Sequence, residues 1–512
     1  MLAYVLRRLL AAVLILLGAS FIVYLLMAYF GGDPLSEVRA SNSPSKDAQI
    51  ARISDQLQLS VPPIFRYFIW LGGAAKCVIP TACDLGQNVK GQEVTSLLTL
   101  AAGNTLQFVT IAFVLAIVIG VTVGIVTALR QYSGLDYSVT FVAFLFFSLP
   151  VFWVAVLLKE FGAIGFNNFL ARPSISTTTM IVLGVVMGAI WVLIIPGGLR
   201  RRVITFVVAA GLTVAILATL VATDWFASPG IGPLMIALCA VGLAVGFTAL
   251  VAGLRNRRAL TASLITAAVG IVSYFVVQPI LNANGNPQTV IMLGVVAIVV
   301  GLAAGWFAGG YDRAQNMRAA ALTAFVTSGL ILVDRFMQSW PAYYDSPLVH
   351  GRPIATIGSE TPNLNGDFWF TGLDKYTHLL LPTLALILIS LASYTRFSRA
   401  SMLEVMNQDY VRTARAKGAN ERSVVVRHAF RNALIPLATV VAADLGALIG
   451  GAVVTERVFS FRGMGTLFID GIFASDPNPV MAVFLVVGVT TVLANLLADV
   501  VYSLLDPRVR LR

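Results

Sequence analysis

Uncharged apolar runs, each about as long as a membrane-crossing helix, recur along the whole 512-residue chain. A helix needs roughly 20 apolar residues to cross the hydrocarbon core of a bilayer. Polar or charged segments separate twelve such runs, which therefore predict an all-α polytopic membrane protein of about 12 transmembrane helices. The predicted spans lie near 9–30, 104–129, 138–158, 179–199, 203–223, 231–254, 260–281, 289–309, 319–337, 376–395, 434–455 and 480–503.

The first run, from Leu9 to Phe30, could belong to a signal peptide. It is longer than the usual run of about 7–15 apolar residues, and no small-x-small cleavage pattern follows it. We therefore expect a retained first helix, with its amino end in the cytoplasm.

Changes in polarity divide the chain into segments of different predicted character. The first helix occupies 1–30 and an extracytoplasmic subdomain 31–103. Two spans follow in 104–160, six inserted helices in 161–340, an extracytoplasmic loop in 341–375, and three spans with a cytoplasmic loop at 396–433 in 376–512. Pro150 lies within the third predicted span, where it could bend the helix for gating or simply for packing.

Charges alternate between the connectors of the six central helices. Basic turns surround Arg201, Arg257 and Arg318, whereas 224–230 and 282–288 contain neither Lys nor Arg. Because cytoplasmic loops are enriched in Lys and Arg, the basic turns predict three hairpins with their turns inside. On this topology both chain termini are cytoplasmic, the inner segments carry 22 Lys/Arg against 6 Asp/Glu, and the remainder carries 13 against 18.

The composition excludes several classes of protein and of site. With 58% hydrophobic and only 12% charged residues, the chain is no soluble enzyme, disordered chain or nucleic-acid-binding domain, and its net charge of +11 reflects orientation in the membrane. The three histidines form no HExxH motif, and no Gly-Lys dipeptide is present, so the chain has no phosphate-binding GxxxxGK[ST] loop and no expected metal site or cofactor. If ATP is used, another chain must hydrolyse it.

Two of the three cysteines, Cys77 and Cys83, lie in the predicted extracytoplasmic subdomain. An oxidising compartment favours a disulfide between them. Two free thiols are the alternative. Cys239 lies in an apolar run and is expected to serve packing.

The longest predicted cytoplasmic loop reads as two short helices. The first includes 408–417, Gly418 ends it as the residue after the cap, and Asn420 is the expected N-cap of a second helix over 421–432. Small residues at the bend would let another protein approach the backbone. The basic residues around it could meet acidic groups on that partner or lipid headgroups.

The loop sequence DYVRTARAKGANERSVVVRHAFRNALIPL resembles the cytoplasmic EAA loop of ABC-importer permeases of the dipeptide/oligopeptide/nickel family. The resemblance extends to the first span ending in Gly-Asp-Pro, to GNTLQFV, SLPVFWVAVLL and GGAVVTERVFSFRGMGTLFIDGI, and to the terminal LLDPRVR. It covers about residues 1–160 and 375–512. Arg412 replaces the Glu of the motif, and a six-span permease lacks the insertion near 161–340.

The resemblance implies half of a translocation pathway for di- or oligopeptides in a bacterial cytoplasmic membrane, and no enzyme in this chain. The implied partners are a second homologous permease subunit forming a heterodimer, one or two cytoplasmic ATPases that bind ATP and Mg, an extracytoplasmic peptide-binding protein and membrane lipid, with no nucleic acid. A permease for nickel or another small solute and a secondary transporter are the alternatives. The inserted hairpins could instead be a separate module for lipid contact or partner docking.

Site residues follow from the same resemblance. The expected ATPase-coupling residues are Asp409, Tyr410, Arg412, Thr413, Ala414, Arg415, Ala416, Lys417, Gly418, Arg427 and Arg431. Contacts with the binding protein are expected from the outer connector, which could equally be a solvated loop: Glu456, Arg457, Arg462, Gly463 and Gly465. Asp444 and Asp499 fall within spans, where carboxylates are costly. They could line a polar cavity or a subunit contact, or make structural hydrogen bonds.

Overall fold

The computed structural model describes residues 2–195, 197–310 and 312–505. The C-terminal residues 506–512, which the sequence predicts to be cytoplasmic, lie outside the described part. The described residues form helices and one isolated antiparallel bridge, between Gln87 and Glu93. Among them, 11 helices are long and apolar enough to cross a membrane, or 12 if one bent pair counts as a span. The predicted all-α polytopic fold is confirmed.

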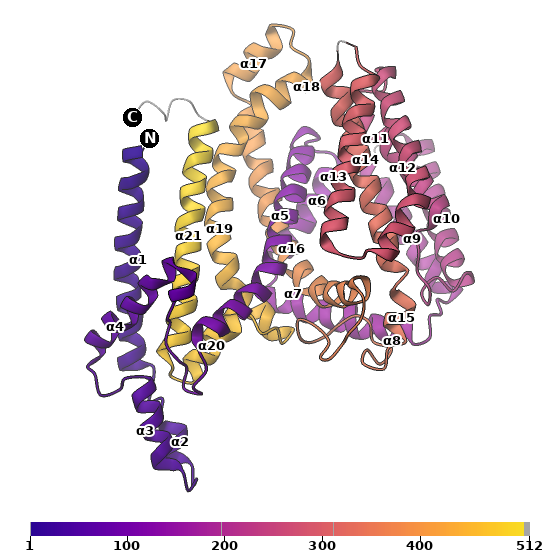
Figure 1. Cartoon of the computed structure of the whole chain (residues 1–512). Helices are drawn as coiled ribbons and strands as arrows, with labels where there is room; N and C mark the ends of the chain where they lie inside the picture. The colour runs from indigo at the N-terminus through magenta and orange to yellow at the C-terminus, as the bar shows by residue number, and fades with distance from the viewer. Residues whose placement is uncertain (1, 196, 311, 506–512) are drawn as a thin grey trace.

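The N-terminal helix α1 (Leu2–Phe30) leads into three short helices, α2 (Ser36–Ala40), α3 (Lys46–Gln56) and α4 (Pro63–Ala75). In Figure 1, α2 and α3 project beyond the end of α1 that is remote from the N-terminus. Two 3₁₀ turns follow, η1 (Lys76–Val78) and η2 (Pro80–Ala82), before α5 (Val94–Leu129) begins. Helix α5 therefore starts ten residues before the predicted span.

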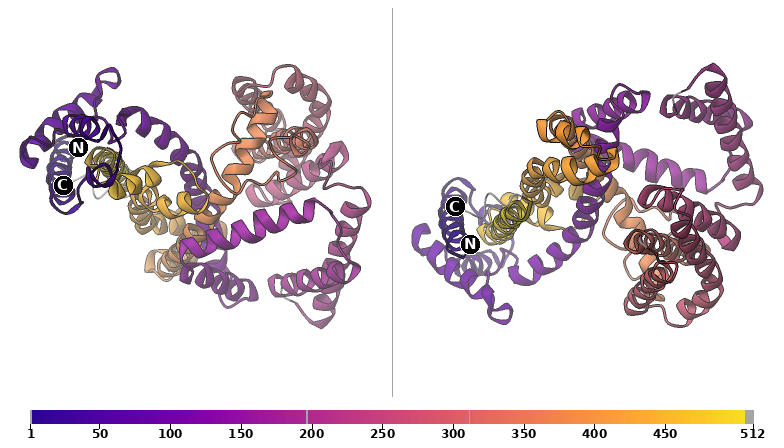
Figure 2. Two further views of the ribbon diagram at one scale, coloured as in Figure 1. Left: turned by 90° about the horizontal axis from the view of Figure 1, so that it is seen from below. Right: turned by 90° about the horizontal axis from the view of Figure 1, so that it is seen from above.

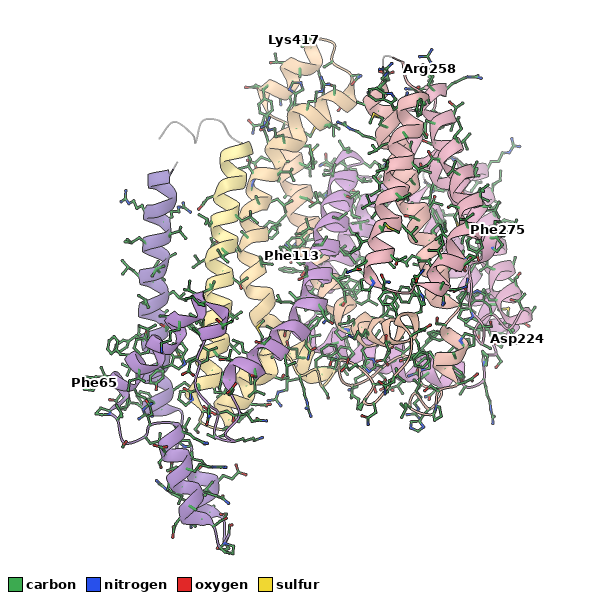
Figure 3. The ribbon with its side chains drawn as sticks, in the orientation of Figure 1. Phe65, Phe113, Asp224, Arg258, Phe275 and Lys417 are labelled. Atoms are coloured by element: carbon green, nitrogen blue, oxygen red, sulfur yellow. A yellow bond between two sulfur atoms is a disulfide. The ribbon has the colours of Figure 1, made fainter. Side chains whose placement is uncertain are left out.

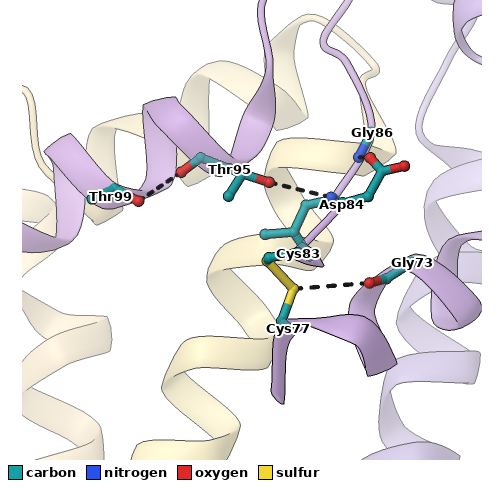
Figure 4. The surroundings of a disulfide bond; sticks show 8 residues. Gly73, Cys77, Cys83, Asp84, Gly86, Thr95 and Thr99 are labelled. Atoms are coloured by element: carbon teal, nitrogen blue, oxygen red, sulfur yellow. Dashed lines mark hydrogen bonds between the residues drawn. A yellow bond between two sulfur atoms is a disulfide. The ribbon is translucent and has the colours of Figure 1, made fainter. Parts of the chain in front are cut away.

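A disulfide joins Cys77 to Cys83. It lies beside the first turns of α5, where Thr95 and Thr99 are labelled in Figure 4. Both cysteines pack against an aromatic cluster around Tyr67. The disulfide thus closes the short connection between α4 and α5.

The third predicted span is broken at Pro150. Helix α6 (Gly134–Ser148) and the helices from Val151 onward are bent by 104°. After the break the chain continues through α7 (Val151–Leu157), the π-helix η3 (Leu158–Gly165) and α8 (Phe166–Leu170). The predicted bend is present, but the predicted span over 138–158 is wrong at its end, because proline disfavours helical backbone at Leu149.

Six helices occupy the region of the three predicted hairpins. They are α9 (Thr177–Ile194), α10 (Leu199–Ala222), α11 (Gly232–Val251), α12 (Arg257–Ala283), α13 (Pro287–Phe307) and α14 (Arg313–Met337). Arg258 lies at the same end of the helices as Lys417, and Asp224 lies at the other (Figure 3). We call these the basic end and the opposite end.

The six helices form two groups, which Figure 2 shows apart. The α9–α10 hairpin packs on α6, and Gly184 and Gly188 let its two helices approach closely. None of the described residues of α10 is buried. Helices α11–α14 form a bundle in which the buried carboxylate of Asp334 accepts hydrogen bonds from the backbone N–H groups of Ile231 (2.7 Å) and Gly232 (2.9 Å).

Trp369 connects this bundle to the remaining helices. Its indole N–H donates to the carbonyl of Leu281 at 2.9 Å, and the guanidinium of Arg335 lies 5.0 Å from the centre of its ring. Trp369 belongs to α16 (Phe368–Met406), which follows the short α15 (Trp340–Tyr344). Helix α16 therefore contacts both the α11–α14 bundle and the remaining helices of the molecule.

Helix α16 packs along α5, with Gly120 and Gly124 against its backbone and small side chains. Around this pair lie α19 (Phe430–Val458), α20 (Met464–Phe473) and α21 (Pro477–Leu505). At the basic end, the guanidinium of Arg399 in α16 donates two hydrogen bonds, of 2.7 and 2.9 Å, to the buried carboxylate of Asp136 in α6. The loop after α16 extends from this core at the basic end (Figure 1).

Candidate functional site

The loop at the basic end begins with α17 (Asp409–Ala416). Gly418 follows with φ of 77°, a left-handed conformation that glycine adopts without steric cost. The side chain of Asn420 then accepts a hydrogen bond from the N–H of Ser423 at 2.7 Å, as expected of an N-cap. The helix end and the cap therefore lie where the sequence predicts them.

The second predicted helix of the loop is not a separate element. Helix α18 (Glu421–Ser423) and the π-helix η4 (Val424–Ala429) lead without a break into α19. No glycine or proline stands between Asn420 and Ile435, so nothing local interrupts the helix. Pro436 lies inside α19 and does not end it. A movement of the loop can therefore pass directly to α19.

One face of α17 is held against the rest of the protein by a small apolar cluster. Val411, Ala414 and Val424 are buried there, with Val405 and Met406 packed against them. Ala414 was predicted to face a partner, but it is only 9% exposed and points into this cluster. The burial links α17 to the end of α16 and to the beginning of the α18–α19 helix.

The other predicted coupling residues lie on the outer face of the loop. All of them are exposed: Asp409, Tyr410, Arg412, Thr413, Arg415, Ala416, Lys417, Gly418, Arg427 and Arg431. Arg415 forms a bidentate ion pair with Glu421, with N–O distances of 3.1 and 2.7 Å. This hydrogen bonding holds the pKa of Glu421 below its usual value and raises the pKa of Arg415. Lys417 and Arg427 form no ion pair with any described residue.

The outer connector differs from its prediction. Glu456 is 1% exposed, and its carboxylate accepts hydrogen bonds from the hydroxyl of Thr105 (2.6 Å) and the N–H of Thr466 (2.9 Å). Gly463 and Gly465 are buried as well. These three residues are buried, unlike the exposed connector residues that the sequence predicts, because α20 folds back against α5 and α19.

Two arginines of the same connector remain on the surface. Arg457 is exposed and pairs with Asp470 at 2.7 Å. Arg462 is exposed, and its carbonyl accepts a hydrogen bond from Asn104 at 3.0 Å. These two predicted contacts with a binding protein therefore remain accessible.

Both carboxylates predicted within spans have a neighbour in the chain. Asp444 of α19 lies beside the hydroxyl of Tyr394 in α16. Asp499 of α21 forms an ion pair with Arg8 of α1. The ion pair of Asp499 joins two helices, as the structural alternative expects, whereas the Tyr394 hydroxyl beside Asp444 has no hydrogen-bond partner among the described residues.

The sequence did not indicate some of the buried carboxylates. Asp374 accepts hydrogen bonds from Tyr343 and Thr361, and Asp476 accepts one from the N–H of Val89 at 2.7 Å. Asp476 directly precedes Pro477, the first residue of α21. An acidic residue followed by proline is a helix-start signal, and it could have identified this position.

Comparison with known proteins places these elements in a family. Residues 330–511 match the family described as "Binding-protein-dependent transport system inner membrane component". The match includes α15 to α21 and leaves α9 to α13 outside.

Several curated relatives are similar to this chain. The oligopeptide transport system permease protein OppB of Mycobacterium tuberculosis is 34% identical over 246 residues, which cover 46% of this chain and 74% of the relative. The corresponding protein AppB of Bacillus subtilis is 42% identical over 154 residues, 30% of this chain and 48% of the relative. The dipeptide permease DppB of Escherichia coli is 42% identical over 138 residues, 27% and 41% of the two chains. By this coverage and identity, the chain belongs to the family of binding-protein-dependent transport system inner membrane components.

Proposed function

We propose that this chain is a permease subunit of an ATP-binding-cassette importer and forms half of a transmembrane pathway for di- or oligopeptides. The observation that carries the proposal is the ordered loop at the basic end, whose exposed face is basic and whose buried face joins α16 and α19. Similarity to permeases named for oligopeptide and dipeptide transport supports the substrate class.

The proposed orientation places the basic end in the cytoplasm. Arg258, next to the α11–α12 turn, lies at the end where Lys417 lies, and the α9–α10 and α13–α14 turns, whose sequences are also basic, lie at that end too, in agreement with the enrichment of Lys and Arg in cytoplasmic loops. The segment with α2, α3 and the disulfide is then extracytoplasmic, where a disulfide persists. Both termini are cytoplasmic in this arrangement.

ATP hydrolysis, the transmembrane pathway and peptide delivery belong to different subunits. A cytoplasmic ATPase, which binds ATP and Mg, docks on the exposed face of α17. Because Val411 and Ala414 pack against Val424 and the end of α16, displacement of α17 is transmitted to α16 and α19. A second homologous permease subunit completes the pathway, and an extracytoplasmic binding protein delivers the peptide. ATP binding opens the pathway outward and hydrolysis resets it.

Photo-crosslinking tests the docking. We expect p-benzoylphenylalanine at position 417 to crosslink a copurifying ATPase, which mass spectrometry would identify. The matched control is position 257, an exposed arginine at the same end but on α12. Crosslinking from both positions alike, or from neither, contradicts docking on α17.

Substitution at Gly418 tests the coupling. No atom lies within 4 Å of a Cβ built there, but the φ of 77° strains a side chain at this position, so Gly418→Asn, whose residue type tolerates this backbone, is the matched control for strain. We expect Gly418→Glu to abolish uptake of radiolabelled trialanine while the complex still assembles and hydrolyses ATP. Normal uptake by this variant would refute the coupling role.

Helices α9–α14 are proposed to be an accessory to this function. The α9–α10 hairpin has little contact with the core, and the family match begins near the end of α14. Deleting 177–222 should leave assembly and peptide uptake in place. Loss of uptake with intact assembly would instead assign the hairpin to transport.

A further inference from the structure

A cavity of about 470 Å³ lies at the opposite end of the helices, between η3, α8, the loop after α15 and α16. Its volume is within the range of small-molecule sites. Six of the described residues that line it carry ionisable side chains: Lys159, Tyr343, His350, Arg352, Glu360 and His378. In the proposed orientation this cavity opens on the extracytoplasmic side.

The walls of the cavity are fixed by buried hydrogen bonds. Asn167 of α8 donates to the carbonyl of Ile354 at 2.8 Å and accepts from its N–H at 3.0 Å. Farther along the loop, Thr361 donates its N–H and its hydroxyl to Asp374 of α16, at 2.9 and 2.6 Å. The loop is thus held at two places, to α8 and to α16.

His378 of α16 lines the cavity. Its side chain is 5% exposed, and Nδ1 lies 2.8 Å from the carbonyl oxygen of Asp374 and 3.5 Å from the carboxylate of the same residue. A carbonyl oxygen can only accept, so Nδ1 carries the proton of this hydrogen bond. Nε2 has no hydrogen-bond partner among the described residues. Because His378 lines the cavity, a ligand bound there could supply a hydrogen-bond partner for Nε2.

Lys159 adds an uncompensated positive charge. Its ammonium donates to the carbonyl of Val458 at 2.8 Å, which leaves further N–H donors, and no described carboxylate lies within ion-pair distance. Arg352, at the exposed part of the wall, likewise has no ionic partner among the described residues. Glu360 is the one carboxylate among the described lining residues and is exposed. The cavity therefore favours a ligand with a carboxylate.

We propose that this cavity binds the carboxylate of a short peptide, with Lys159 and Arg352 facing the carboxylate and His378 hydrogen-bonding beside it. The substrate class rests on the proposed function, but the site is distinct from the coupling loop at the other end of the molecule. Such a site would hold peptide at the extracytoplasmic face after its release from the binding protein.

Calorimetric titration of trialanine into the full complex tests the proposal. The complex is reconstituted in lipid nanodiscs without the binding protein, so that peptide bound to the latter does not mask the cavity. We expect saturable binding, and binding of trialanine amide at least about tenfold weaker, since a charged hydrogen-bonding partner is lost. Equal binding of acid and amide, or no saturable binding, would overturn the proposal.

Variants locate the binding. Lys159→Met should weaken trialanine binding about tenfold. Arg352→Gln should weaken it less, and its exposed position leaves folding intact. The matched control, Arg457→Gln, removes an exposed arginine that does not line the cavity. If Lys159→Met fails to assemble, Arg352→Gln decides alone, and unchanged binding in that variant refutes the site.

The two proposals can fail separately. Uptake of trialanine with the binding protein and ATP tests the transport function. Binding without the binding protein tests the cavity. Uptake with no binding in the cavity refutes only the site, whereas binding with no uptake of any peptide by an assembled complex refutes the transport function.

Discussion

Thr105 and Glu456 lie 351 positions apart in the sequence, yet the hydroxyl of Thr105 donates to the carboxylate of Glu456 at 2.6 Å, and both residues are buried. The same hydroxyl oxygen accepts from the N–H of Met464 at 2.8 Å. This pair holds α5, α19 and α20 together.

Glu456→Ala is expected to lower stability by about 2–3 kcal/mol, because the buried donors of Thr105 and Thr466 lose their acceptor. Glu456→Gln retains one acceptor and should cost less. The midpoint of thermal unfolding of the purified protein measures both. Asp470→Asn, in an exposed ion pair, is the control and should change stability by less than about 1 kcal/mol. An equal effect of Glu456→Ala and Asp470→Asn would contradict the structural role.

Asp476 should make stability depend on pH. It is 1% exposed, and burial raises its pKa from 3.8 to about 6. A carboxyl whose pKa is raised by folding stabilises the native state fully below its unfolded pKa. That contribution is lost as the pH rises through the folded value. Stability should therefore fall between pH 4 and about 6, by roughly 3 kcal/mol for a shift of about two pKa units.

Asp476→Asn should remove this pH-dependent step, since the amide does not ionise, while its carbonyl can still accept from Val89. Unfolding midpoints measured from pH 4 to pH 7.5 compare the two proteins. A slope that is the same in both would show that other groups cause the dependence.

The two alanines of α17 should respond differently to enlargement. Ala414 is buried against Val411 and Val424, so Ala414→Leu overpacks the cluster at a cost of about 1–3 kcal/mol and loosens the loop. Ala416 is exposed, and Ala416→Leu leaves the loop folded. Trypsin cleavage after Arg415 and Lys417 should accelerate only in Ala414→Leu. Equal acceleration in both variants would contradict the burial of Ala414.

The disulfide can be tested by counting thiols. Protein denatured without reductant should react with N-ethylmaleimide at one cysteine, Cys239. After reduction all three cysteines should react, as intact mass would show. Three labels without reductant would mean that Cys77 and Cys83 are free.

The helices could be predicted because their cause is local. Apolar runs of membrane-crossing length indicate α9 to α14 within about six residues, and basic turns indicate which ends lie together. Gly418 and Asn420 likewise determine the loop geometry through their own backbone and side chain. The end of α6 was missed because the sequence shows a proline but not the angle of the bend.

Which residues of the candidate site are buried could not be predicted from the local sequence. Glu456 looks like a charged connector residue until α20 packs over it, and Ala414 looks accessible until Val424 covers it. Which face of a short helix is covered depends on contacts between distant segments. Asp374 and His378 acquire their roles for the same reason, from a loop whose path the sequence does not reveal.

The contact of Trp369 with Leu281 and Arg335 has a mechanical consequence. If α16 tilts during transport, it carries α11–α14 sideways through the bilayer. The moving body is then much wider than a single helix, so it must displace more lipid in each cycle. Turnover would accordingly slow in a more viscous membrane, and lipid composition would set the speed of the pump.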